Sequence, residues 1–245
     1  NWINKYLKEI EKYPVKSNVK FHEIFDKLPA KAPEEPEEFN DIFDDFNKII
    51  MPGITHWQSP NFFAYFPANS SYPSLLAEML ISALAAQCMK WETSPSAAEL
   101  EEMVMNWMRD MTGLPKNFIG VIQDTASTST LASILTAREF HSEFSINKKG
   151  FSGQERYRVY CSTETHSSIE KAVKIAGIGR DNLIKIEVDK NFAMIPEKLE
   201  EAIKSDVRMG FHPLCVVAAI GTTGSTAVDP LKAISRLKKE YKFWL

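Results

Sequence analysis

The fold is decided by residues 157–188, which read YRVYCSTETHSSIEKAVKIAGIGRDNLIKIEV. A short, largely apolar run at 157–162 predicts a strand, and a second run at 183–188 predicts another. Between them, the spacing of apolar residues predicts a helix over 168–176. Parallel strands need a crossover connection of this kind. The stretch therefore predicts an α/β fold with a mostly parallel sheet and flanking helices.

The same alternation continues on both sides of this stretch. Apolar runs with turn residues between them predict strands at 120–123, 214–220 and 242–245. Amphipathic segments predict helices at 127–140, 196–204 and 230–241. We therefore expect one sheet to be built from the chain between residue 120 and residue 245.

The first part of the chain has a different pattern. Apolar residues spaced three and four apart predict helices at 39–50, 73–88 and 96–111. Because short helices with an apolar stripe need a surface to cover it, we expect residues 1–60 to form a helical arm that serves as a dimerisation segment. Residues 61–245 are then expected to form a large domain that is incomplete.

Composition excludes several classes of protein. The 245 residues are 44% hydrophobic and carry a formal net charge of −3, which disfavours both a disordered chain and a basic nucleic-acid-binding surface. No run approaches the roughly 20 apolar residues of a membrane span. Three cysteines, Cys88, Cys161 and Cys215, suggest neither a disulfide framework nor a zinc site. We expect a cytoplasmic protein, with no nucleic acid, membrane or metal partner.

The loop after the first predicted strand is a candidate anion site. It reads DTASTST over residues 124–130, so small hydroxyl residues, among them Thr125 and Ser127, open a helix. Unpaired backbone N–H groups and the helix dipole favour a phosphate at such a position, and small side chains such as Ala126 allow close approach. A plain helix cap would need only one hydroxyl. The sequence is neither a P-loop nor a GxGxxG fingerprint.

Two further loops are polar at the carboxyl ends of predicted strands, where ligands bind in α/β sheets. One carries His166, which could act in chemistry or serve only the structure, and the other carries Thr223 in the run GTTGST. Asp229 is most simply the cap of the following helix. A Ser-His-Asp hydrolase built from Ser127, His166 and Asp229 is an alternative, although the G-x-S-x-G elbow is missing.

The aromatic segment at 59–72 has two interpretations. Its side chains, including Phe62, Phe63, Tyr65 and Phe66, could pack in the core or form the wall of a pocket. The sequence leaves both open.

Five segments carry a family resemblance. They are HWQSPNFFAYFP at 56–67, WETSP at 91–95, GVIQDTAS at 120–127, THSS at 165–168 and GTTG at 221–224. In this order they resemble the group II pyridoxal-phosphate-dependent amino-acid decarboxylases, above all the aromatic-L-amino-acid decarboxylase branch. The resemblance extends from about residue 50 to the last residue.

The resemblance implies a fold, a cofactor and a reaction. The fold is that of the fold type I pyridoxal-phosphate-dependent transferases, the cofactor is pyridoxal 5′-phosphate, and the reaction is decarboxylation of an L-amino acid, most naturally an aromatic one, to the amine and CO2. By the same resemblance, Thr125, Ala126 and Ser127 hold the cofactor phosphate and Thr223 contacts the cofactor. His166 stacks on the cofactor ring and contacts the substrate carboxylate. The substrate-binding loop corresponds to Tyr65, Phe66, Pro67 and Ala68.

The sequence also departs from the family. The lysine that binds the cofactor covalently and the aspartate that holds its ring nitrogen protonated have no match in residues 1–245, so we expect the chain to be the N-terminal portion of the enzyme. Asp124-Thr125 replaces a usual Gly-Ser, and Ala68 replaces a frequent threonine. Glutamate, histidine or another amino acid therefore stays open as substrate, as does the choice between an amine and an aldehyde as product. A catalytically inactive fragment that binds phosphate or dimerises is a further alternative. The expected partners are an amino-acid substrate and a second copy of the chain or a complementing C-terminal fragment.

Overall fold

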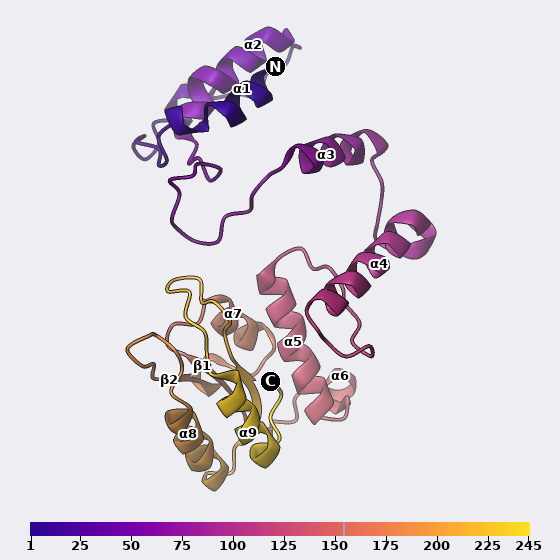
Figure 1. Ribbon diagram of the computed structural model, residues 1–245, viewed down its shortest axis with the longest axis vertical. Coiled ribbons are helices and arrows are strands. Elements are labelled where there is room, and N and C mark those ends of the chain that lie inside the picture. Colours follow the sequence, from indigo (N-terminus) through magenta and orange to yellow (C-terminus); the bar gives the residue numbers. More distant parts are fainter. Residues whose placement is uncertain (154) are drawn as a thin grey trace. The chain divides into compact units, whose positions relative to one another are not determined.

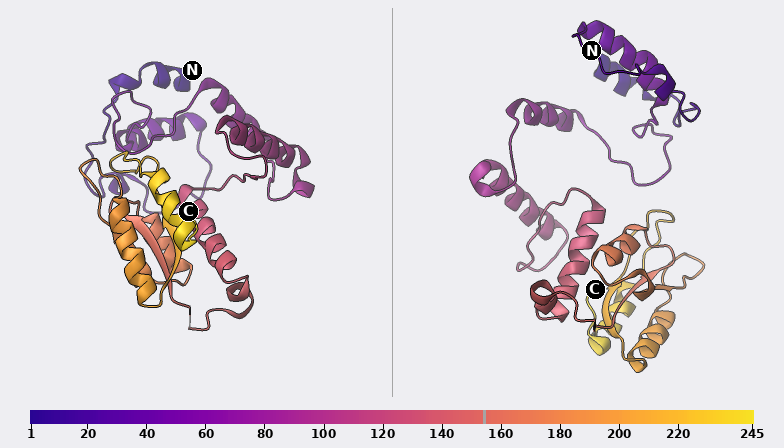
Figure 2. Two further views of the ribbon diagram at one scale, coloured as in Figure 1. Left: turned by 60° about the horizontal axis from the view of Figure 1, so that its bottom comes forward. Right: turned by 180° about the vertical axis from the view of Figure 1, so that it is seen from behind.

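The structure is a computed structural model that describes residues 1–153 and 155–245. Its internal contacts divide it into two compact units, Asn1–Ala86 and Gln87–Leu245 (Figures 1 and 2). The division falls later in the chain than the end of the predicted arm at residue 60, and the assignment of that arm to dimerisation stays a prediction.

The first unit is helical. Its α-helices are α1 (Trp2–Lys8), α2 (Phe39–Asp45) and α3 (Tyr72–Leu84). The helix predicted at 39–50 is present, but its second half, Phe46–Ile50, is a π-helix. Trp2 stacks on Tyr6 at 5.3 Å and meets Phe46 edge-on at the same centroid distance. His56 is buried and its Nδ1 lies 2.8 Å from the Tyr6 hydroxyl, so aromatic rings and one imidazole form the centre of this unit.

The second unit contains the sheet. Its helices and strands are α4 (Pro95–Met111), α5 (Ala126–His141), α6 (Ser145–Lys149), β1 (Tyr157–Ser162), α7 (Ser168–Ile175), β2 (Leu183–Ile186), α8 (Pro196–Arg208), β3 (His212–Val217) and α9 (Leu231–Tyr241). The three strands are parallel in the order β2-β1-β3. The predicted α/β class and parallel sheet are confirmed.

The two faces of the sheet are covered by different helices. Side chains alternate between faces along a strand, so Val159 and Tyr160 of β1 point to opposite sides. Val159 packs in one core with residues of α5 and α7. Tyr160 packs in a second core with residues of α8 and α9. The strands and these four helices therefore form a three-layer sandwich around a central β1 (Figure 1).

Two of the predicted strands are not formed as expected. Residues 120–123 are irregular, and the prediction of a strand there is wrong for this structure. Val121 and Ile122 are exposed, and the Ile122 N–H donates to the Glu101 carboxylate at 2.9 Å, because no strand lies beside it among the described residues. At 242–245 only Trp244 pairs with β3, through an isolated parallel bridge to Cys215.

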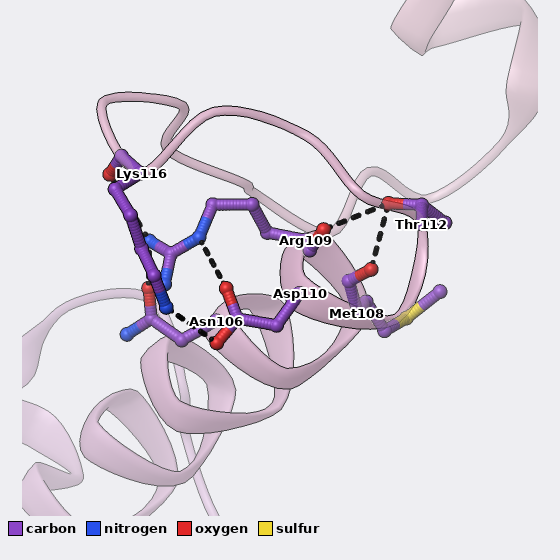
Figure 3. Close-up of polar contacts among 6 residues, drawn as sticks. All are labelled: Asn106, Met108, Arg109, Asp110, Thr112 and Lys116. Carbon is purple, nitrogen blue, oxygen red and sulfur yellow. Dashed lines mark hydrogen bonds and ion pairs between the residues drawn. The ribbon is translucent and has the colours of Figure 1, made fainter.

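The end of α4 is tied to the loop that follows it (Figure 3). The Arg109 guanidinium donates to the Asn106 side chain at 2.7 Å and to the Asp110 carboxylate at 3.0 Å. The Lys116 ammonium contacts the other oxygen of Asp110 at 2.8 Å. Lys116, followed by Arg109, holds the pKa of Asp110 below its usual value. These contacts fold the chain back after Gly113, whose φ of +71° is one that glycine adopts readily.

None of the helices in the described part of the chain has both the length and the apolar character needed to cross a membrane.

Candidate active site

The start of α5 has the features of an anion site. Thr125 is the N-cap, and its hydroxyl oxygen accepts a hydrogen bond from the Thr128 backbone N–H at 3.2 Å. The N–H groups of Ala126 and Ser127 occupy the first two helical positions, which have no acceptor within a helix. All three residues are exposed. The helix therefore presents backbone donors and the positive end of its dipole to a ligand.

His166 lies in the turn between β1 and α7 and is held in one orientation. Its Nδ1 accepts a hydrogen bond from the Ser168 backbone N–H at 3.2 Å and lies 3.0 Å from the Ser168 hydroxyl. Because a backbone N–H can only donate, the proton of the neutral ring is on Nε2. The exposed ring can therefore donate its Nε2–H to a ligand carboxylate.

The loop after β3 is braced by its own hydroxyl groups. Thr222 is buried, its hydroxyl lies 2.7 Å from that of Ser225, and it accepts a hydrogen bond from the Ala227 N–H at 3.1 Å. Gly221 has a φ of +83°, which suits a residue without a side chain. Thr223 follows at the tip of the loop and is half-buried. The loop therefore presents Thr223 from a braced turn.

Asp229 is not the simple helix cap that the sequence predicts. Pro230 occupies the N-cap position of α9, and no side chain caps that helix. Instead, one oxygen of the Asp229 carboxylate accepts from the Met194 N–H at 2.8 Å and the other from the Ala219 N–H at 2.7 Å. The side chain is buried, with 2% of its surface exposed. Asp229 thus fastens both ends of the Thr223 loop to the body of the unit, a role that the Asp-Pro pair does not reveal.

The three loops share one edge of the sheet. His166 and Thr223 follow the carboxyl ends of the neighbouring parallel strands β1 and β3. The start of α5 reaches the same edge, because Ser129 and Thr130 line a pocket of about 470 Å³ together with Val217 and Ala218. The sequence-predicted residues Thr125, His166 and Thr223 therefore lie in loops along one edge of the sheet, although none of them lines this pocket.

Cys215 also lines that pocket but is not a nucleophile. Burial raises the pKa of its thiol to about 12 and that of Cys161 on the adjacent strand to about 11. Both thiols stay protonated near neutral pH, and a thiol in this form is a poor nucleophile. Among the described residues, no group of three or more histidine, cysteine, aspartate or glutamate side chains could hold a metal ion.

The hydrolase alternative does not fit this geometry. His166 Nδ1 is bonded to Ser168, and both oxygens of Asp229 are bonded to backbone N–H groups. A Ser-His-Asp triad needs the aspartate on the histidine and the histidine on the serine. Ser127, His166 and Asp229 are therefore not arranged as a triad.

The predicted substrate-binding loop lies in the other unit. Tyr65, Phe66, Pro67 and Ala68 are all exposed, so none of them packs in the core of the first unit. Tyr65 adopts a left-handed backbone conformation with a φ of +59° and stacks on Trp57 with ring centroids 5.6 Å apart. Phe63 is exposed and Phe62 half-buried, which favours a surface role over core packing for most of this segment.

Sequence reasoning missed two supporting residues. Ser168 orients His166, and the signal for it is the spacing of two residues between them, with the serine opening a helix. Asp229 anchors the Thr223 loop, and no local pattern reveals it, since its partners lie 10 and 35 residues away.

The chain is also similar to known proteins. Residues 22–245 match the family described as "Pyridoxal-dependent decarboxylase conserved domain". The chain is 40% identical to tryptophan decarboxylase 2 of Oryza sativa subsp. japonica and 40% identical to phenylacetaldehyde synthase of Arabidopsis thaliana, covering 100% of this chain and 50% and 51% of those proteins. The crystal structure of Catharanthus roseus tryptophan decarboxylase in complex with L-tryptophan superimposes with a TM-score of 0.91 at 38% identity, over 99% of this chain and 53% of that one.

The chain thus spans about half the length of the curated relatives it matches. The matched segment includes the α5 turn, the His166 loop and the Thr223 loop. The predicted family is confirmed, and with it the dependence of that family on a pyridoxal cofactor. The chain belongs to the pyridoxal-dependent decarboxylase family.

Proposed function

We propose that the protein carrying this chain removes the carboxyl group of an aromatic L-amino acid with pyridoxal 5′-phosphate as cofactor. The observation that carries the proposal is the convergence of three loops on one sheet edge: the N-terminus of α5, the fixed imidazole of His166 and the braced loop of Thr223. Similarity to tryptophan decarboxylases supports the reaction.

The residues present fit this cofactor. The backbone N–H groups of Ala126 and Ser127, with the hydroxyl of Ser127, would hold its phosphate, while Thr125 keeps the helix end in place. Thr223 would contact the cofactor from the neighbouring loop. When bound, pyridoxal phosphate acts as the electron sink for the electrons left on the α-carbon as CO2 departs.

His166 has two tasks in this proposal. Its flat ring supports the face of the cofactor, and its Nε2–H donates to the substrate carboxylate. The bond from the Ser168 N–H to Nδ1 holds the tautomer that makes this donation possible. The carboxyl group that leaves is thereby oriented by a residue of this chain.

Substrate and product are proposed more coarsely. The exposed rings of Tyr65 and Phe66, with Pro67 and Ala68, favour an aromatic substrate. Glutamate or histidine is the alternative within the family. The similarity to a phenylacetaldehyde synthase keeps an aldehyde open as product beside the amine.

Partners and location complete the proposal. We propose a cytoplasmic homodimer in which residues 1–60 contact the second copy, or an assembly with a complementing C-terminal fragment. The alternative to an enzyme is a protein that binds the cofactor phosphate without catalysis.

Two measurements test the proposal, cofactor binding by the 1–245 chain and CO2 release by a polypeptide that carries it. Titration with pyridoxal phosphate should show binding, and Ser127→Asp should weaken it at least tenfold because the new carboxylate faces the phosphate. Thr136→Asp, which adds the same charge further along α5, serves as control. Release of CO2 from tryptophan, tyrosine and glutamate then identifies the substrate class.

Each outcome decides between the alternatives. Binding with CO2 release from tryptophan or tyrosine supports the enzyme, and release from glutamate alone overturns the aromatic assignment. Binding by the 1–245 chain without CO2 release by any polypeptide that carries it supports the non-catalytic alternative. Equal binding by Ser127→Asp and the unchanged chain contradicts the assignment of the phosphate to α5.

A further inference from the structure

The loop at 58–70 is closed by one side chain. The Gln58 amide nitrogen donates to the Ala68 carbonyl at 2.8 Å, and the Gln58 amide oxygen accepts from the Ser70 N–H at 3.1 Å. A single side chain thus bonds two backbone groups that lie 10 and 12 residues further along the chain. This pair of bonds, the Gln58 clamp, fastens the end of the loop to its beginning.

The beginning of the loop is itself fixed. His56 is buried, its N–H donates to the Val15 carbonyl at 3.0 Å, and its ring contacts the Tyr6 hydroxyl. Ser59, on the other side of Gln58, is also buried, and its N–H donates to the His56 carbonyl at 3.0 Å. Gln58 therefore extends from a rigid base.

The middle of the loop holds a strained conformation. Tyr65 has a φ of +59°, a left-handed backbone conformation that a bulky residue rarely adopts. Such a conformation persists only where its surroundings enforce it. Trp57 contributes by stacking on Phe62, with ring centroids 4.7 Å apart, and on Tyr65, with centroids 5.6 Å apart. The clamp contributes by fixing the chain at Ala68, three residues after Tyr65.

The result is an ordered loop whose rings point outward. Tyr65 is 68% exposed and Phe66 is 58% exposed. A ring that is held in place yet uncovered, as the Tyr65 ring is by its stacking on Trp57, can bind a ligand with a smaller loss of side-chain and loop entropy. The loop is thus preorganised for contact with a planar group.

We infer that Gln58 is a positioning residue for substrate binding, because its side-chain amide holds residues 65–68 in the conformation that presents Tyr65 and Phe66. The inference rests on the proposed role of that segment in the substrate site. Gln58 touches no reacting atom, so its loss weakens binding of substrate and transition state alike. Such a change raises KM and leaves kcat unchanged.

Amide hydrogen exchange on the 1–245 chain tests the clamp itself. Gln58→Ala should accelerate exchange of the Ser70 amide at least tenfold, because that N–H loses its acceptor. Gln58→Glu retains an acceptor for Ser70 but loses the donor to Ala68, so Ser70 should stay protected. Asn69→Ala changes an exposed side chain between the two clamped residues and should leave Ser70 exchange unchanged.

Kinetics of an active polypeptide that carries residues 1–245 test the role in binding. Gln58→Ala should raise KM for the aromatic substrate about tenfold, as expected for two lost hydrogen bonds, with kcat within twofold. Asn69→Ala should match the unchanged protein in both parameters. The split between KM and kcat separates positioning from a general loss of folded protein, which would lower the apparent kcat.

Each result supports or overturns the inference. Unchanged Ser70 exchange in Gln58→Ala overturns the clamp, and faster exchange with unchanged KM overturns the positioning role. If no such polypeptide releases CO2, the proposed function fails, and Gln58→Ala is judged by the dissociation constant of L-tryptophan. Weaker tryptophan binding by Gln58→Ala then supports the inference. An unchanged dissociation constant, or no tryptophan binding to either chain, overturns it.

Discussion

The sheet of the second unit and helix α3 of the first are similarly apolar in sequence, yet they differ in burial. Leu214 of β3 is fully buried between the strands and α5. Leu80 of α3 is 63% exposed, and Leu76, Met79 and Leu84 beside it are exposed as well. In α4, within the second unit, Trp107 is exposed by 56%.

This difference shows that a stripe of apolar residues predicts which face of a helix or strand can be buried, but does not reveal which surface buries it. The apolar side chains of parallel strands are buried by the helices that connect the strands, since each crossover helix packs back on the sheet. The segments that flank α3 in the sequence do not bury its apolar face in this way. Large exposed apolar patches mark surfaces that contact another protein surface, and the α3 face has that character.

The largest expected effect compares two leucine truncations. Leu214→Ala removes fully buried methyl groups and should lower the free energy of unfolding of the second unit by about 2–5 kcal/mol. Leu80→Ala removes groups that already face solvent and should change the stability of the first unit by less than about 0.5 kcal/mol. Urea unfolding of the 1–245 chain, followed for each unit by hydrogen exchange, measures both.

If Leu80→Ala lowered the free energy of unfolding as much as Leu214→Ala does, α3 would not be exposed in solution. Sedimentation at several concentrations then shows whether a second copy covers the face. If the chain stays monomeric at all concentrations and Leu80→Ala still lowers its stability strongly, another part of the same chain buries the α3 face.

A second prediction concerns Asp229. Asp229→Ala leaves the N–H groups of buried Met194 and half-buried Ala219 without acceptors and should destabilise the second unit by about 2–4 kcal/mol. Asp229→Asn retains one acceptor oxygen and should cost less than the alanine. Exchange of the Met194 and Ala219 amides measures the local effect, and unchanged exchange in the alanine variant would show that the carboxylate does not fasten this loop.

Two tyrosines compare the units directly. The Tyr160 hydroxyl donates to the buried Asp206 carboxylate at 2.9 Å, and burial followed by Asp206 raises the pKa of Tyr160. Tyr160→Phe should cost about 1.5–3 kcal/mol, because a hydrogen bond to a charged group is lost. Tyr6→Phe removes the partly buried contact with His56 and should cost about 0.5–1.5 kcal/mol. Urea midpoints check the order, and a larger cost at Tyr6 would reverse the comparison.

The smallest expected effect is a pH dependence shared by both units. Burial lowers the pKa of His56 in the first unit and of His141 and His212 in the second. Their folded pKa values lie below the unfolded value of about 6.5, so the unfolded chain binds more protons as the pH falls. The free energy of unfolding is therefore highest above about pH 7 and decreases as the pH falls below the unfolded pKa of about 6.5.

Unfolding at pH 7.5 and pH 5.5 checks this dependence. His212 Nε2 lies 2.9 Å from His141 Nδ1. His212→Gln should reduce the pH dependence of the free energy of unfolding of the second unit, because one histidine of this pair no longer titrates. His56→Gln should do so only in the first unit. Stability that rises on acidification would show that the histidines are protonated in the fold.

Much of the candidate site could be predicted from sequence, because its groups act through local geometry. Thr125 caps a helix three residues away, and His166 is oriented by Ser168 two residues away. Gln58 and Asp229 could not be predicted in their roles, since their partners lie 10 to 35 residues away in irregular segments.

The sequence by itself determined the alternation of strands and helices, the polar loops at the carboxyl ends of strands and the family. These follow from periodicity and from short-range hydrogen bonding, which operate within a few residues. Only the tertiary structure decided that residues 120–123 form no strand, that Asp229 braces a loop and that the apolar faces of α3 and α4 stay uncovered. A strand requires a neighbouring strand, a buried carboxylate requires donors and an apolar face requires a partner, and none of these is encoded in the segment that needs it.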